Sequence, residues 1–176
     1  MELIIHTGLF GDLLKLLDLH RLDLVLANHP APPDASSSFE NTLIDEQRVS
    51  LVGRKLVKPS RFRFPHDLAD TPVVLPGRGS ALRSAFDALM GSSGIRPTIT
   101  AEVDDMAMLR LMARESSGVT LVPSIVVIDE LRSGLLVERA RLNALKEQFF
   151  AVTQQRRYPN PLVAELIGAR NRRRTV

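Results

Sequence analysis

The 176-residue sequence contains no cysteine. Disulfide bonds, thiolate-bound zinc and cysteine nucleophiles are therefore excluded. No stretch approaches the ~18 uninterrupted apolar residues of a membrane-spanning helix, and Met1-Glu2 does not begin a signal peptide. These absences predict a soluble, cytoplasmic protein with no membrane partner.

Motifs typical of enzymes are also missing. The sequence has no phosphate-binding Gly-Lys-Ser/Thr loop and no Gly-x-Ser-x-Gly elbow. Gly77-Arg78-Gly79 hints at a dinucleotide turn, but Leu82 stands where the third glycine belongs. The histidines show no metal-ligand spacing; they are His6, His20, His29 and His66. We therefore predict no catalytic activity, no cofactor and no dedicated metal site.

Positive charge is scarce outside the C-terminus. The formal net charge is +3 at pH 7, and four arginines at the C-terminus supply more than all of it, which leaves −1 for the rest. A body of that charge is not a basic nucleic-acid surface. We interpret the tail as a helix end whose cations favour the C-terminal dipole; its arginines are Arg170, Arg172, Arg173 and Arg174.

What the sequence does contain is an alternation of short apolar runs with helical stripes. At 44% hydrophobic content the chain can bury one domain or two small lobes. The alternation favours an α/β fold with largely parallel sheets and crossover helices. Strands are predicted at 3–5, 22–27, 39–44, 48–52, 73–75, 98–103, 119–122, 135–137 and 149–153, and the main helices begin at residues 9, 80, 106 and 161.

Two strand–turn–helix units are the most informative part of the chain. In the first, Gly77 and Gly79 permit positive φ and close approach of a ligand, and Ser80 can cap the following helix. In the second, Asp104-Asp105 separates a strand from a helix that begins at Met106. Free N–H groups at a helix start favour an anion. The units predict a binding cleft, with ordinary capped crossover helices as the alternative.

Four side chains in or near this cleft have two interpretations, with the two aspartates taken as a pair. Arg78 is either an anion holder or a solvated arginine. Asp104-Asp105 is either a carboxylate pair, for acid/base work or cation binding, or a helix cap with a dipole-favoured neighbour. His29 is either a ligand contact or a solvated loop histidine.

A family resemblance follows from the order of several segments. Leu13-Leu14 through Arg21-Leu22-Asp23-Leu24-Val25-Leu26, then Asp67-Leu68-Ala69 with Pro72, then Gly118-Val119-Thr120-Leu121-Val122-Pro123 resemble the effector-binding domain of LysR-type transcriptional regulators. Residues 75–82 and Glu102-Val103-Asp104-Asp105 resemble especially the NhaR-like branch, which activates a sodium/proton antiporter gene in bacteria. The resemblance covers nearly the whole chain.

The resemblance implies a two-lobed periplasmic-binding-protein-like (type 2) α/β fold. Lobe I would comprise residues 1–70 plus 150–176, and lobe II residues 71–149, with hinge crossings near Asp70 and Phe149-Phe150. Relative to the family, the chain lacks the N-terminal winged helix-turn-helix, the dimerising linker helix and the first strand and helix of the sensor domain. Lobe I is therefore expected to be truncated at its N-terminus, and DNA binding to belong to the absent segment.

The implied function is that of a ligand-sensing regulatory domain. A small-molecule or ion effector would bind between the lobes and act through the geometry of a homodimer or higher oligomer. Sodium would take Asp104 and Asp105 as ligands, and Leu9 stands where many relatives carry a small hydroxyl residue. The alternative is a free-standing α/β solute-binding protein or small-molecule enzyme. The implied effector contacts are Gly8, Leu9, Asn28, His29, Arg78, Gly79, Ser80, Asp104, Asp105, Met106 and Pro123.

Overall fold

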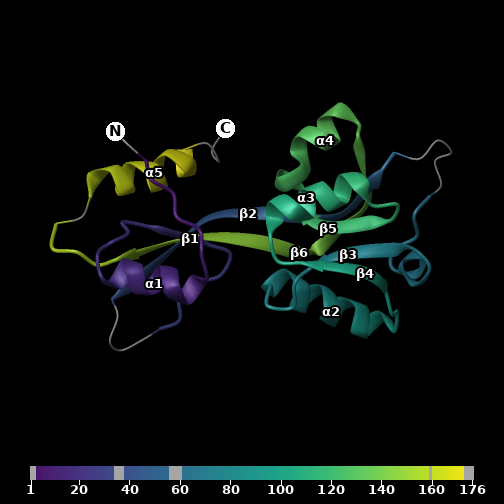
Figure 1. Cartoon of the computed structure of the whole chain (residues 1–176), viewed down its shortest axis with the longest axis horizontal. Helices are drawn as coiled ribbons and strands as arrows, with labels where there is room; N and C mark the ends of the chain where they lie inside the picture. The colour runs from purple at the N-terminus through teal and green to yellow at the C-terminus, as the bar shows by residue number, and fades with distance from the viewer. Residues whose placement is uncertain (1–2, 34–37, 56–60, 159, 173–176) are drawn as a thin grey trace. The chain divides into compact units, whose positions relative to one another are not determined.

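The computed structural model describes residues 3–33, 38–55, 61–158 and 160–172, with side chains through residue 168. The chain divides into two compact units (Figure 1). Unit 1 comprises Met1–Glu46 and Gln148–Val176, and unit 2 comprises Gln47–Glu147. The arginine side chains of the C-terminal tail lie outside the described part. Among the helices of the described residues, none is long and apolar enough to cross a membrane.

Two long strands run from one unit into the other. β2 (Phe39–Arg54) leaves unit 1 after Glu46, and β6 (Leu136–Gln154) returns to it after Glu147. The second crossing lies close to the predicted one, but the first differs: residues 47–70 group with unit 2 instead of lobe I. The physical reason is that the second half of β2 pairs with β5 (Val119–Pro123). Each long strand also joins two segments predicted as separate strands.

Unit 2 is built on a mixed sheet. Its hydrogen-bonded order is β6-β2-β5-β3-β4, where β3 (Pro72–Pro76) runs parallel to both β5 and β4 (Thr98–Val103). β2 runs antiparallel to β5, so the sheet is less uniformly parallel than predicted. Two short 3₁₀ helices, η1 (His66–Ala69) and η2 (Ser124–Val127), precede β3 and follow β5.

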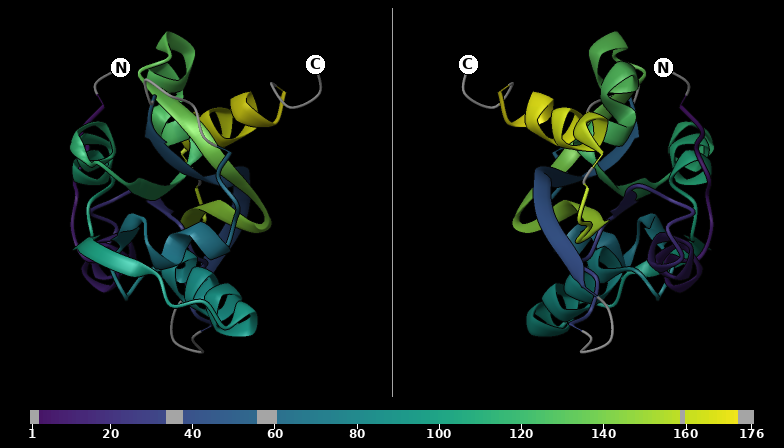
Figure 2. Two further views of the ribbon diagram at one scale, coloured as in Figure 1. Left: turned by 90° about the vertical axis from the view of Figure 1, so that its right-hand side faces the viewer. Right: turned by 90° about the vertical axis from the view of Figure 1, so that its left-hand side faces the viewer.

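Helices cover both faces of the unit 2 sheet. α2 (Ala81–Ser93) lies on one face, and α3 (Met106–Glu115) and α4 (Ile128–Ser133) lie on the other (Figures 1 and 2). Side chains alternate between the faces of a strand. Val73 and Leu75 accordingly pack with Phe86 of α2, whereas Val74 packs with Leu109 of α3. Unit 2 therefore has a buried apolar cluster on each side of its sheet.

Unit 1 is smaller and less regular. α1 (Phe10–Asp18) packs on β1 (Val25–Ala27), which pairs antiparallel with the end of β6, and α5 (Pro161–Arg172) follows β6 in the chain. The predicted strand at residues 3–5 is wrong. That segment has no regular structure, and its side chains are 68–77% exposed. A strand is stabilised by hydrogen bonds to a neighbouring strand, and none pairs with these residues in the described part. The unit 1 core is Leu14, Leu17, Val25, Ala31 and Val152.

Candidate functional site

The carboxyl ends of three parallel strands meet at one edge of the unit 2 sheet. Pro76 of β3 is in register with Val103 of β4, so the two turns that follow these strands are neighbours. The backbone N–H of Gly77 donates to the Val103 carbonyl over 3.0 Å. In α/β sheets this edge is where ligands bind. Pro123, at the end of β5, lies at the same edge because β5 is parallel to β3.

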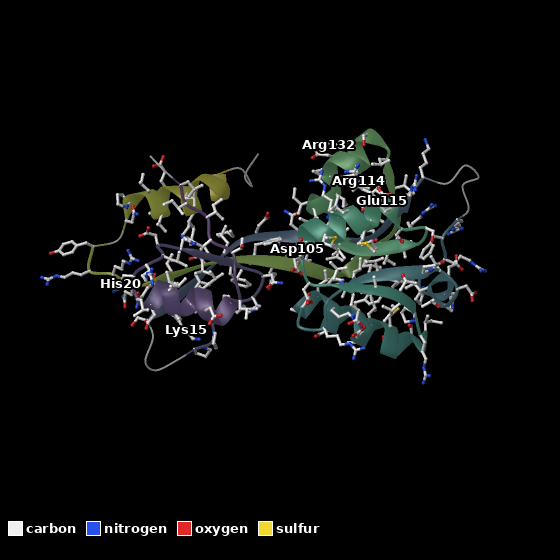
Figure 3. The ribbon with its side chains drawn as sticks, in the orientation of Figure 1. Lys15, His20, Asp105, Arg114, Glu115 and Arg132 are labelled. Carbon is white, nitrogen blue, oxygen red and sulfur yellow. The ribbon has the colours of Figure 1, made fainter. Side chains whose placement is uncertain are left out.

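Both helices that leave this edge carry the predicted caps. Ser80 Oγ accepts from the N–H of Arg83 at 3.4 Å, and Asp105 Oδ1 accepts from the N–H of Met108 at 2.7 Å. Figure 3 shows Asp105 at the start of α3, whose first residue is Met106. Each cap satisfies one of the backbone donors that a helix start leaves free. The capping interpretation of Asp105 is therefore confirmed.

Arg78 contacts a carboxylate of its own unit. Its side chain is 81% exposed, and its Nε lies 3.4 Å from both carboxylate oxygens of Glu102 on β4. An arginine beside a carboxylate has less positive potential to offer an anionic ligand than a free one. The structure thus shows a solvated arginine in a surface ion pair, and the anion-holding role stays a prediction.

A second arginine, Arg83, donates hydrogen bonds to β3 and β4 at this edge. The sequence did not single it out. Its side chain is only 4% exposed. Nη1 donates to the Pro76 carbonyl at 3.1 Å, and Nη2 donates to Glu102 Oε1 at 3.0 Å. Nε donates to Asp87, one turn along α2, at 2.9 Å. Hydrogen bonds from Arg83 hold the pKa of Glu102 below its ordinary value, so this carboxylate is charged at neutral pH.

Asp104 lies directly against the glycine turn. A methyl group added at Gly77 would overlap the Asp104 carboxylate in its present position, so a larger residue at 77 would displace that exposed side chain. Together with Glu102 and Asp105, Asp104 gives the edge three carboxylates against the two guanidinium groups of Arg78 and Arg83. Counted over these five side chains, the edge carries one net negative charge.

A polar cluster beside the end of β5 was also missed. Ser50 Oγ on β2 donates to Glu138 Oε1 at 2.6 Å and lies 3.1 Å from Ser124 Oγ. Arg141 Nη2 donates to Glu138 Oε2 at 2.7 Å, and hydrogen bonds from Arg141 and then Ser50 lower the pKa of Glu138. The available signal was Ser50 itself, a polar residue inside the apolar run Val49-Ser50-Leu51-Val52.

The four site residues predicted in unit 1 lie on two segments that touch through one ring contact. Gly8 and Leu9 precede α1, while Asn28 and His29 follow β1. The ring of His29 meets that of Phe10 edge to face, with centroids 4.2 Å apart, and this contact joins the two segments. His29 is thus packed against an aromatic ring. The expectation that Gly8 and Leu9 follow a strand is wrong, because residues 3–5 form none.

The described residues offer few side chains that could hold a metal ion together. Within the described ranges, no three His, Asp or Glu side chains are grouped so that they can hold a metal ion. Asp104 and Asp105 are a two-carboxylate set, and one oxygen of Asp105 already caps α3. A hard cation there would take its remaining ligands from carbonyls, hydroxyls or water.

Comparison with known protein sequences matches the chain to a transcriptional activator. The chain is 24% identical over 154 residues to the transcriptional activator protein NhaR of Escherichia coli (strain K12), a match that spans 88% of this chain and 50% of that protein. The chain therefore spans about half the length of the curated relatives it matches.

Solved structures show the same fold. The bromide-bound regulatory domain of HypT from Salmonella typhimurium matches with a TM-score of 0.66 and 16% identity, covering 91% of this chain and 75% of that one. The effector-binding domain of QuiR in complex with shikimate matches with a TM-score of 0.65 and 16% identity, covering 93% and 76%. These likenesses confirm the predicted α/β periplasmic-binding-protein-like fold. The model of the LysR substrate-binding domain matches residues 1–172, and the chain belongs to that family.

Proposed function

We propose that this chain is the ligand-sensing domain of an NhaR-like transcription regulator, acting by binding and not by catalysis. The observation that carries the proposal is the edge of unit 2, where two capped helix starts and the Ser50–Ser124–Glu138 cluster surround the carboxyl ends of parallel strands. Relatives of the same fold hold a bromide ion or shikimate, which supports a small effector here. Such a regulator works in the cytoplasm and reaches DNA through a different domain.

The proposed effector contacts fall into two groups. Unit 2 contributes the turns that follow β3, β4 and β5, and unit 1 contributes the segments before α1 and after β1. Effector binding would change the geometry of a homodimer or higher oligomer. The contacts in unit 2 are Arg78, Gly79, Ser80, Asp104, Asp105, Met106 and Pro123, and those in unit 1 are Gly8, Leu9, Asn28 and His29.

The charge of the edge favours a cation over a carboxylate effector. Arg78 already faces Glu102, and the Asp104 carboxylate lies against the turn that an anion would enter. An anion at this turn would meet like charge, which disfavours binding. Sodium, which the NhaR resemblance suggests, prefers oxygen ligands of the kind that Asp104 supplies.

The test compares thermal unfolding of the whole chain in sodium, potassium and choline chlorides at equal ionic strength. We expect sodium to raise Tm relative to the other two salts, because a ligand that binds only the folded state stabilises it. The double variant Asp104→Asn with Asp105→Asn should abolish that difference. Asparagine caps helices about as well as aspartate, so the fold should survive. Glu115→Gln, an exposed change at the far end of α3 (Figure 3), is the matched control.

Two results would contradict this assignment. Equal Tm values in the three salts would remove sodium as the effector. A chloride- or benzoate-dependent rise in Tm that Arg78→Ala abolishes, and the asparagine variant does not, would establish an anion site at the α2 start.

Association and DNA binding test the rest of the proposal. Exposed Leu3, Ile4, Ile5 and Leu9 support self-association, because large apolar side chains left in water are often covered by a partner. Light scattering should report a dimer or larger assembly, and a compact monomer at all concentrations would contradict this prediction.

The chain alone should show no sequence-specific DNA binding, and any weak binding should fall steeply with salt.

A further inference from the structure

Three polar side chains of unit 2 form a chain of hydrogen bonds at the carboxyl end of β5. Ser50 Oγ donates to Glu138 Oε1 at 2.6 Å and lies 3.1 Å from Ser124 Oγ. Ser50 on β2 is fully buried, whereas Ser124, the first residue of η2, is half-buried. The chain of hydrogen bonds therefore runs from a carboxylate, through a buried hydroxyl, to a hydroxyl on a partly exposed residue.

Glu138 fixes the direction of the protons in this chain. Hydrogen bonds from Arg141 and Ser50 hold the pKa of the Glu138 carboxyl below its ordinary value, so the group is ionised at neutral pH and can only accept. A serine hydroxyl has a single proton, and Ser50 gives its proton to Glu138. In the bond between the two hydroxyls, Ser124 is therefore the donor, which uses its only proton. Ser124 Oγ can then offer a ligand nothing but a lone pair.

Ser124 lies at the edge where the effector is proposed to bind. It directly follows Pro123, beside the carboxyl ends of β3 and β4. Ser50 stands between two β2 residues that pack in the α2-side cluster, so its hydroxyl faces the α3 side of the sheet. Met106 at the start of α3 packs in the same apolar cluster as Val127 of η2. The hydrogen-bond chain and the α3 start therefore lie on the same side of the sheet.

An acceptor that cannot donate discriminates between classes of ligand. A cation, an N–H group or an O–H group can be bound by a lone pair of Ser124 Oγ. A carboxylate oxygen or a halide ion would face that lone pair with no proton between them, which costs free energy in a partly buried place. The strongest donor of the cluster is engaged elsewhere, because Arg141 Nη2 donates to Glu138 Oε2 at 2.7 Å.

We propose that Ser124 Oγ contacts the effector as an acceptor only, and that Ser50 and Glu138 are positioning residues that fix the direction of its proton. The β5 end of the site thereby selects a cation or a hydrogen-bond donor over an anion. This inference rests on the proposed effector site at the unit 2 edge, and it adds a contact that the predicted effector residues do not include.

The Arg141 contact allows the direction of the chain to be reversed by one substitution. In Glu138→Gln, Arg141 Nη2 still needs an acceptor, so the amide oxygen should take the place of Oε2 and the amide nitrogen the place of Oε1. The nitrogen then donates to Ser50, Ser50 donates to Ser124, and the proton of Ser124 is turned toward the ligand. An isosteric change thus converts Ser124 from an acceptor into a donor.

The experiment measures thermal unfolding of the whole chain in sodium chloride, choline chloride and choline acetate at equal ionic strength. For the unchanged chain we expect sodium, and not acetate, to raise Tm relative to choline chloride. Ser124→Ala should weaken sodium binding about fivefold, because it removes one oxygen contact. Glu138→Gln should weaken sodium binding at least as much and make acetate stabilising. Ser133→Ala, which removes an α4 hydroxyl bonded to the Glu130 carbonyl, is the matched control.

A double variant separates the reversed proton from the loss of one negative charge. Adding Ser124→Ala to Glu138→Gln removes the hydroxyl that would donate, so the stabilisation by acetate should disappear. An effect of charge alone would survive in the double variant. The Tm of each variant in choline chloride is its own reference, so a general change in stability does not enter the comparison.

The possible outcomes distinguish this inference from the proposed function. Equal Tm values of the unchanged chain in sodium and choline chlorides would overturn both. A sodium effect that Ser124→Ala leaves intact would overturn the Ser124 contact alone. The contact would also be wrong if Ser133→Ala weakened sodium binding as much as Ser124→Ala does. An acetate effect in Glu138→Gln that survives Ser124→Ala, or a sodium effect that Glu138→Gln leaves unchanged, would show that the direction of the protons does not matter.

Discussion

Unit 2 and unit 1 differ in how completely they cover their own apolar residues. Unit 2 packs one apolar cluster on each face of its sheet, whereas unit 1 has a single cluster of five buried residues. Of the fifteen large hydrophobic side chains exposed in the described ranges, ten belong to unit 1. Helices on both faces of a sheet make a closed core. Unit 1 therefore carries apolar surface that its own elements do not bury, which suits association.

The largest expected effect is a loss of stability when one buried leucine in the core of each unit is replaced by alanine. Leu121 on β5 and Leu17 on α1 are both fully buried. We expect Leu121→Ala to lower the free energy of unfolding by about 4 kcal/mol and Leu17→Ala by about 2 kcal/mol, because the smaller cluster collapses more readily around a cavity. Urea unfolding measures both, with exposed Leu166→Ala as the control. A Leu17→Ala cost equal to that of Leu121→Ala would show that the unit 1 core is as tightly packed.

The next largest expected effect is the loss of stability when the buried Arg83 of unit 2 is replaced. Arg83→Met keeps roughly the side-chain volume, removes the donor to the Pro76 carbonyl and leaves Glu102 with only the exposed Arg78. We expect a loss of about 2–3 kcal/mol, less than for a fully buried ion pair because Glu102 is 33% exposed. Arg78→Met, at an exposed position on the same glutamate, should cost under about 0.5 kcal/mol. Comparable losses in the two variants would refute a special role for Arg83.

Acid should weaken unit 2 through its carboxylates. Four carboxyl groups of unit 2 have lowered pKa values, from an arginine hydrogen bond at each glutamate and from the Arg63 backbone N–H at the aspartate: Asp67, Glu102, Glu130 and Glu138. A carboxyl whose folded pKa is depressed contributes stability above its unfolded pKa, about 4, and loses it as pH falls through the folded value. Amide exchange between pH 6 and pH 3 should show unit 2 protection falling.

Glu138→Gln tests this acid effect directly. The variant removes one of the four titrations, so its unfolding free energy should depend less steeply on pH below about 4.5 than that of the unchanged chain. Exposed Glu115→Gln is the control. An identical acid slope in Glu138→Gln and the unchanged chain would mean that the Ser50–Arg141 environment of Glu138 contributes nothing.

The smallest expected effect is a gain in the free energy of unfolding, whereas the other substitutions lower it. Thr120 on β5 is fully buried, and its hydroxyl has no hydrogen-bond partner in the part of the chain that the structure describes. Thr120→Val replaces that hydroxyl with a methyl group of similar size and should raise the free energy of unfolding by about 1 kcal/mol. Thr100→Val, which removes a 3.2 Å bond to the Val73 carbonyl, should lower it slightly. Destabilisation by Thr120→Val would reveal an unseen partner, such as a buried water.

The sequence predicted those parts of unit 2 that depend on local pattern. Ser80 and Asp105 cap helices because their side chains reach the next turn of the same segment. Arg83 could not be predicted to be buried, since its burial depends on Glu102, which lies on a different element. The structure of unit 1 was harder to predict because it, too, depends on contacts between different elements. Residues 3–5 have strand-like composition, but a strand also needs a neighbour to pair with.

The close approach of Gly77 and Asp104 has a consequence for how this family diversifies. A side chain at 77 and the Asp104 carboxylate in its present position compete for one volume, so bulk at 77 requires that carboxylate to rotate away. Relatives that gain bulk at the first position should show a shorter or rotated residue at the second. The residue at 77 would then set where the carboxylate at 104 lies, and with it the charge that this turn presents to a ligand.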